Sequence, residues 1–274
     1  MSNDRKGGWE LPISEGELSR LTTEMRDAHE ATLPAMHASA RDMVQSLFDL
    51  KRTGTQPEPE QTSLGRRGFL IGAGAAATML TLAACGGGSS DIKAAAPSPA
   101  GSPSAGTYTG DLKVVALAAA LENQAVAAYQ AALTAAKAGK LGTVPPAVAT
   151  FVQTAMDQHQ DHAEAWNAIL AGAGKPKITG TPLSNHDDVV KALGQVKDVP
   201  GVAKLALQLE DQATQTYVFA ASNVKNIDGV TTAATIAPVE AMHAAILHFV
   251  LGQYPVPDDF IATDKAASPD LLTA

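Results

Sequence analysis

The sequence predicts an all-α protein whose main domain is a four-helix bundle. Three observations predict it: long helical stretches divided by glycine and proline, a helical pattern that occurs twice, and a composition with few rings. Of the 274 residues, 45% are hydrophobic but only 4% are aromatic. Alanine, leucine and valine must therefore build the core. That hydrophobic fraction excludes a fully disordered chain.

Four helices are expected between residues 108 and 254. Their signals are Pro145-Pro146 at the start of the second helix and Gly139, Gly172 and Gly252 at or just after helix ends. The first three helices are expected over 111–138, 145–172 and 199–223. The fourth is expected to begin at Ala233 or Pro238 and to end at Gly252. A long crossover over 173–198, with a short helix at about 185–196, joins the second helix to the third.

The two helical hairpins carry a repeated pattern. Leu121-Glu122-Asn123-Gln124-Ala125 recurs as Leu209-Glu210-Asp211-Gln212-Ala213, and a tyrosine, Tyr129 or Tyr217, follows each glutamate by seven residues. The second helix has His159-x-x-His162 and the fourth has Glu240-x-x-His243. Residues at i and i+3 share one helical face. Two such hairpins joined by a crossover predict a bundle with polar side chains at its centre.

This pattern resembles the ferritin-like superfamily, especially its small exported members. In that family two helices each supply a glutamate and two each supply Glu-x-x-His, and together these hold two metal ions. The resemblance implies metal ligands at Glu122, His159, His162, Glu210, Glu240 and His243. It also places Tyr129 and Tyr217 beside the ligands, as core residues with tethered hydroxyls.

The chain departs from the family pattern at one position. His159 stands where the family has a carboxylate, so two cations would face three carboxylates instead of four. Two Fe or Mn ions are the expected cofactors, and a single Zn or Cu is the alternative that the softer donor set favours. Residues 85–274 contain only four glutamates, and three of them fall on the expected ligand positions. Buried glutamate is costly unless it is paired or metal-bound.

An export signal is expected before the bundle. Arg66 and Arg67 precede an apolar run over 68–84, which resembles a twin-arginine signal. The run ends Leu82-Ala83-Ala84-Cys85, which resembles a bacterial lipobox, and Cys85 is the only cysteine of the chain. Lipid on Cys85 and the twin-arginine translocase are the expected membrane partners. The alternative is a buried core cysteine in an alanine-rich helix.

The domain division follows from these signals. We expect 1–62 as a partly helical N-terminal tail, 63–84 as the signal, 85–107 as the lipidated cysteine and a flexible linker, 108–254 as the bundle and 255–274 as a C-terminal tail. Ser14-x-x-Glu17 is a capping box that opens a helix to about Lys51, and Pro34 is expected to kink or split it. His29 and His37 are expected to be solvated or part of a weak apolar stripe, with no metal role.

The expected function is a metal-binding protein anchored to the outer face of the cytoplasmic membrane in a bacterial envelope. Its metal centre would oxidise metal or detoxify oxidant, as a ferroxidase-like or peroxide-consuming oxidoreductase. Two alternatives stay open: a non-catalytic envelope lipoprotein with a metal-free bundle, which binds a partner or supports structure, and a single-metal binder. The net charge of −8 and the absence of nucleotide-binding fingerprints exclude nucleic acid and nucleotides. A homo-oligomer is compatible with the sequence.

Overall fold

The computed structural model describes residues 9–53, 106–257 and 261–274. Within these ranges the chain is all-α, as predicted, and has no strand beyond one isolated bridge between Leu183 and Leu272. The predicted export signal and lipobox, with Arg66, Arg67 and Cys85, lie outside the described residues.

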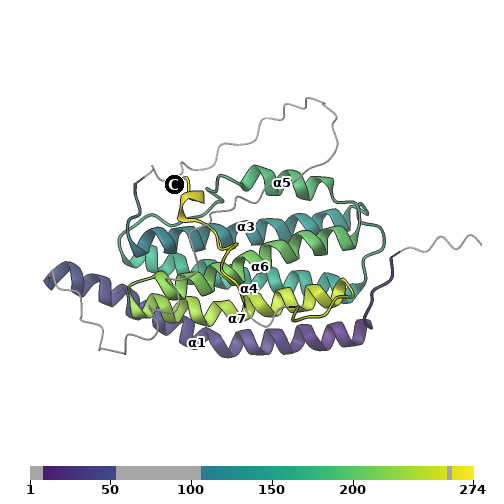
Figure 1. Cartoon of the computed structure of the whole chain (residues 1–274), viewed down its shortest axis with the longest axis horizontal. Helices are drawn as coiled ribbons and strands as arrows, with labels where there is room; N and C mark the ends of the chain where they lie inside the picture. Colours follow the sequence, from purple (N-terminus) through teal and green to yellow (C-terminus); the bar gives the residue numbers. More distant parts are fainter. Residues whose placement is uncertain (1–8, 54–105, 258–260) are drawn as a thin grey trace, which may run out of the picture.

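Four long helices form the ferritin-like bundle (Figure 1). They are α3 (Asp111–Lys137), α4 (Pro146–Gly172), α6 (Val199–Asn223) and α7 (Ile227–Val250). Helix α3 packs along α4, and α6 packs along α7, so each half of the sequence repeat is one hairpin. The bounds predicted for the first three helices are confirmed to within one residue.

Helix α7 begins earlier than the sequence predicted. We expected a start at Ala233 or Pro238, but the Asn226 side chain caps the helix by accepting hydrogen bonds from the backbone nitrogens of Asp228 and Gly229. Pro238 lies inside the helix, where it removes one backbone hydrogen bond. The predicted start was wrong, because the Asn226 cap begins the helix and Pro238 is accommodated within it.

Helix α7 is also very apolar. Among the described residues it is the one helix long and apolar enough to cross a membrane, with a mean hydropathy of 1.4 over its best window. However, 56% of that window is buried inside the protein. A buried core helix has the same length and composition, so the hydropathy of α7 alone is weak evidence that this helix crosses a membrane.

The crossover and the C-terminal segment lie on the outside of the bundle. Helix α5 (His186–Gln195) packs against α3, as Figure 1 shows, and matches the short helix expected in the crossover. The C-terminal segment carries a short 3₁₀ helix, Pro269–Leu271. The backbone nitrogen of Ala267 donates to Thr216 Oγ1 at 2.8 Å, which ties this segment to α6.

Helix α1 (Glu15–Thr53) is a fifth long helix and lies along α4 and α7 (Figure 1). Its start is as predicted, because the Ser14 hydroxyl oxygen accepts a hydrogen bond from the Glu17 backbone nitrogen at 3.1 Å. Of the two outcomes expected at Pro34, the split does not occur, since α1 continues through this residue; a kink there stays a prediction. Packing against two neighbours outweighs the hydrogen bond that the proline removes. The buried apolar residues of α1 include Leu18, Met25, Met36, Ala40 and Met43.

The buried apolar residues form two clusters along the bundle. The first cluster contains residues 115–120 of α3 and Trp166 of α4. The second cluster contains Tyr129 of α3 and Phe151 of α4. The buried polar side chains of these helices lie between the two clusters. The bundle therefore places a polar layer in the middle of an apolar core.

Candidate metal centre

All six residues predicted as ligands meet in this polar layer. Each is at most 2% exposed. They are Glu122 on α3, His159 and His162 on α4, Glu210 on α6, and Glu240 and His243 on α7. The i, i+3 spacing brings both residues of each pair to the inner face of its helix.

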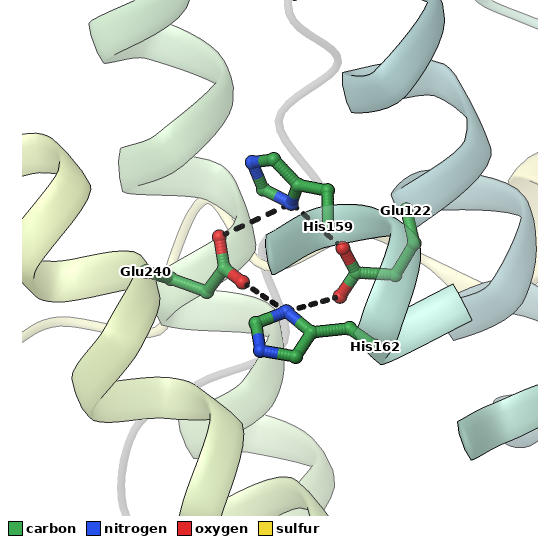
Figure 2. A group of neighbouring side chains, drawn as sticks. All are labelled: Glu122, His159, His162 and Glu240. Carbon is green, nitrogen blue, oxygen red and sulfur yellow. Dashed lines mark hydrogen bonds and ion pairs between the residues drawn. The ribbon is translucent and has the colours of Figure 1, made fainter. Parts of the chain in front are cut away.

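One group of four contains Glu122, His159, His162 and Glu240 (Figure 2). His162 Nδ1 lies 2.9 Å from Glu240 Oε1 and 3.6 Å from Glu122 Oε1. His159 Nδ1 lies 2.7 Å from Glu122 Oε2 and 3.7 Å from Glu240 Oε2. The two carboxylates therefore flank the two imidazoles, and all four donor atoms lie within 4.8 Å of one another.

A second group of four contains His159, Glu210, Glu240 and His243. His243 Nδ1 lies 3.2 Å from Glu210 Oε2 and 3.5 Å from Glu240 Oε2. His159 reaches this group through its other ring nitrogen, since Nε2 lies 3.1 Å from Glu210 Oε1. Glu240 and His159 thus belong to both groups, and His159 turns one nitrogen toward each.

The two predicted tyrosines hold the carboxylates of the opposite half. Tyr129 on α3 donates to Glu210 on α6, and Tyr217 on α6 donates to Glu122 on α3. Tyr217 also accepts a hydrogen bond from Trp166 Nε1 at 3.0 Å. Burial and the adjacent carboxylates raise the pKa of both tyrosines well above the usual value, so both hydroxyls keep their protons.

Without a metal, the centre balances its own charges. Burial disfavours the His162 cation, but the Glu122 and Glu240 carboxylates outweigh this and raise its pKa to about 9. The same competition raises the pKa of His159 and of His243. Burial would raise the pKa of Glu122, yet His162 and His159 outweigh it and lower the value to about 2. The neighbouring carboxylates therefore favour the protonated form of each of the three imidazoles.

The donor atoms also fit a metal ion. Both carboxylate oxygens of Glu240 and the Nδ1 atom of His162 are buried without a hydrogen bond to any described residue. His162 Nδ1 and Glu240 Oε1 lie 2.9 Å apart without the geometry of a hydrogen bond, and the donor atoms of the group lie within 4.8 Å of one another. Buried polar atoms left this way are costly, and a cation among them would satisfy them. Imidazole and carboxylate donors suit Fe, Mn, Zn and Cu.

A small, partly open hollow between α3 and α6 adjoins the centre. Glu122, His159 and Glu210 line its inner part, and Leu121 and Leu209 are among the residues around it. A small molecule can approach the carboxylates from this side. On the opposite side, α1 covers α4 and α7.

Sequence reasoning missed two neighbours of the centre. Gln158 Oε1 lies 2.7 Å from His243 Nε2, and no spacing signal distinguishes this glutamine. His29 on α1 is 2% exposed, and its ring centroid lies 5.2 Å from that of His162. His29 lies on the buried face of α1, two helical turns before Met36. This spacing from an apolar residue was the one sequence signal that pointed to its burial. His37 is exposed, in line with the other expectation.

The comparisons agree with the fold and the site. A family profile for the ferritin-like domain matches residues 110–253, more than half of the chain. No curated protein and no solved structure matches it. Fold, site and profile define a helical bundle with buried histidine and glutamate clusters that are compatible with metal. The chain belongs to the ferritin-like family.

Proposed function

We propose that this protein binds two metal ions, Fe or Mn, at the bundle centre and uses them to oxidise metal or to consume oxidant. The observation that carries the proposal is the arrangement of two four-residue groups around the shared Glu240. Each group has a carboxylate and a histidine of its own, Glu122 with His162 and Glu210 with His243. Glu240, which has no hydrogen bond within the described parts of the chain, would serve both ions.

The residues around the ligands would support redox chemistry. The metal ions, when bound, would supply electron transfer to oxygen or peroxide. Tyr129 and Tyr217 hold the carboxylates of Glu210 and Glu122 in place. The apolar clusters on both sides would exclude bulk water, and the hollow between α3 and α6 would be the side from which a small oxidant approaches.

We also propose that the protein works at the outer face of the cytoplasmic membrane. The support comes from the sequence: Arg66 and Arg67, an apolar run and a lipobox follow one another in the required order. All seven arginines of the chain precede Cys85, the only cysteine. Lipid on Cys85 and a flexible linker would hold the bundle close to the membrane.

A second candidate function is a metal-free binding or structural module. The observation that favours it is the charge balance of three imidazoles and three carboxylates, which lets the centre stay folded as a polar network. His159 creates this balance, because a carboxylate there would leave the network negative. A single Zn or Cu ion bound in one of the two groups would be intermediate between the two-metal centre and the metal-free module.

Anaerobic loading of the full chain with Fe(II), followed by exposure to oxygen or peroxide, separates these functions. We expect the wild-type chain to oxidise Fe(II) faster than buffer does, and the Glu240→Gln variant to lose this activity. Glu164→Gln is the matched control, because Glu164 is an exposed glutamate on α4. A folded wild-type chain that takes up no iron or manganese would refute the redox function and leave the metal-free module.

A further inference from the structure

Helix α1 is built into the apolar core rather than laid loosely on it. Leu18 and Met25 belong to one core cluster, and Met36 and Met43 belong to the other. All four side chains are buried. The helix therefore spans the whole length of the α4/α7 side, including the polar layer between the clusters. Removing it would expose apolar surface at both ends of the centre.

Two glycines on the bundle make room for α1. A Cβ atom at Gly172 on α4 would lie 2.5 Å from Val44 Cγ2. One at Gly229 on α7 would lie 3.0 Å from Met43 Sδ. Any side chain at Gly172 would force Val44 to move. The surface of the bundle is thus shaped for this helix at close range.

Polar contacts at three points fix the register of α1. Glu15 Oε2 accepts a hydrogen bond from the Ala147 backbone nitrogen at 3.2 Å, the buried hydroxyls of Ser39 and Thr232 are 2.7 Å apart, and Ser46 Oγ donates to Asp228 Oδ2 at 2.9 Å. These contacts reach the first turn of α4 and the first turns of α7. An apolar stripe alone would allow α1 to slide by one turn, whereas these pairs specify one position.

This position sets His29 beside His162. The two rings pack edge to face, with centroids 5.2 Å apart and planes at 62°. His162 turns Nδ1 toward Glu240 and Glu122. Its Nε2, like that of His29, is buried with no hydrogen-bond partner in the described ranges, and the carboxylate of Asp161 lies 4.0 Å from His29 Nε2. A histidine that ligates metal generally needs a partner at its second ring nitrogen, and that partner fixes the ring and its tautomer.

We propose that α1 is a fifth helix of the metal centre, and that His29 is a positioning residue for His162. The proposal rests on metal binding as the proposed function. Because coupling between two binding events is reciprocal, docking of α1 should tighten metal binding and metal should tighten the docking of α1. Helix α1 precedes the proposed signal and Cys85 in the chain, so the proposed coupling concerns the full chain before cleavage at the proposed lipobox.

Cobalt titration of the full chain tests the role of His29. His29→Leu keeps the bulk and removes both ring nitrogens, while His29→Gln keeps a hydrogen-bonding group. We expect His29→Leu to weaken cobalt binding by about 10- to 100-fold and to shift its visible absorption bands. His29→Gln should retain most of the affinity. His37→Leu, at an exposed position of the same helix, should match the wild type.

Hydrogen exchange of residues 18–43, with and without cobalt, tests the docking of α1 directly. In the metal-free chain we expect these amides to be protected, and cobalt should slow their exchange further. His29→Leu should lose the cobalt-dependent part and keep the rest. Unprotected amides in the folded, metal-free chain would overturn docking.

The outcomes separate this inference from the proposed function. Protected α1 amides in a chain that binds no metal would refute the metal function and the coupling together, and leave the docked helix standing. Strong metal binding with equal affinities in His29→Leu and His37→Leu would overturn the role of His29 alone. Circular dichroism of each variant shows that the bundle is folded, and His29→Gln provides the readout if His29→Leu does not fold.

Discussion

The two hairpins of the bundle, α3 with α4 and α6 with α7, place glutamate, tyrosine and histidine at equivalent positions but differ in charge. In both, a glutamate on the first helix accepts a hydrogen bond from the tyrosine of the other hairpin. In both, a histidine ends the i, i+3 pair of the second helix. The difference lies at the start of that pair, where the first hairpin has His159 and the second has Glu240.

This single difference decides what the centre can be without metal. With glutamate at both positions, four buried carboxylates would face two imidazoles and would need cations. With His159, the centre has as many imidazoles as carboxylates, so it depends less on added cations. The repeat fixes where the side chains lie, whereas one residue fixes how strongly the centre demands metal.

The largest expected effect comes from removing Glu240, the carboxylate that both groups share. Glu240→Gln keeps the shape of the side chain and removes its charge, so we expect it to abolish binding of both ions. Glu122→Gln affects one group and should leave about one ion per chain. Elemental analysis of folded protein, dialysed without chelator, measures this. Equal loss in the two variants would contradict the shared role of Glu240.

Restoring the symmetry of the hairpins should be the next largest effect. His159→Glu puts a fourth carboxylate among two imidazoles, and an unpaired buried charge costs about 3–5 kcal/mol. We expect the metal-free variant to unfold at lower denaturant concentration, and Mn(II) to restore its stability. Denaturant unfolding with chelator and with Mn(II) measures both. A variant as stable as the wild type in chelator would argue against the charge balance.

The sequence predicted the fold, and the structure brings the six predicted side chains together, for a physical reason; their role as ligands stays a prediction. Glycine, proline and the i, i+3 pairs are local signals, and the bundle turns them into a common centre. The contribution of α1 was not predictable in the same way. Its weak stripe indicated a helix, but nothing local shows that Val44 meets Gly172 or that His29 meets His162. Such contacts depend on how distant helices pack.

The pH dependence of the metal-free chain should reveal the paired charges. The pKa of His162 is raised from 6.5 to about 9, so its stabilisation is complete below 6.5 and is lost as the pH rises through 9. The pKa of Glu122 is lowered from 4.5 to about 2, so its stabilisation is lost as the pH falls from 4.5 toward 2. The His162 shift corresponds to a loss on the order of 3 kcal/mol.

Chemical unfolding at pH 6 and pH 9, in chelator, measures this loss. We expect the free energy of unfolding to be smaller at pH 9. Metal should reverse the trend, since it displaces protons from the imidazoles and binds more tightly at the higher pH. A metal-free chain that is more stable at pH 9 would contradict the pairing of His162 with the carboxylates.

The smallest expected effect is the difference in stability between the Tyr129→Phe and Tyr217→Phe variants. Tyr129→Phe removes one hydrogen bond to a carboxylate, which is worth about 1.5–3 kcal/mol. Tyr217→Phe removes the equivalent bond and also leaves Trp166 Nε1 buried without its partner, which adds about 1–3 kcal/mol. Denaturant unfolding of the two variants measures the difference. Equal destabilisation would show that the hairpins hold their carboxylates in the same way.

The number of metal ions per chain tests the central claim most directly. The full chain, folded and reconstituted without oxygen in excess Fe(II) or Mn(II), would be freed of unbound metal and analysed for its elements. Two ions per chain is the result that the shared Glu240 and His159 predict. A single Zn or Cu ion in preference to Fe and Mn, or no metal at all, would contradict the dinuclear centre.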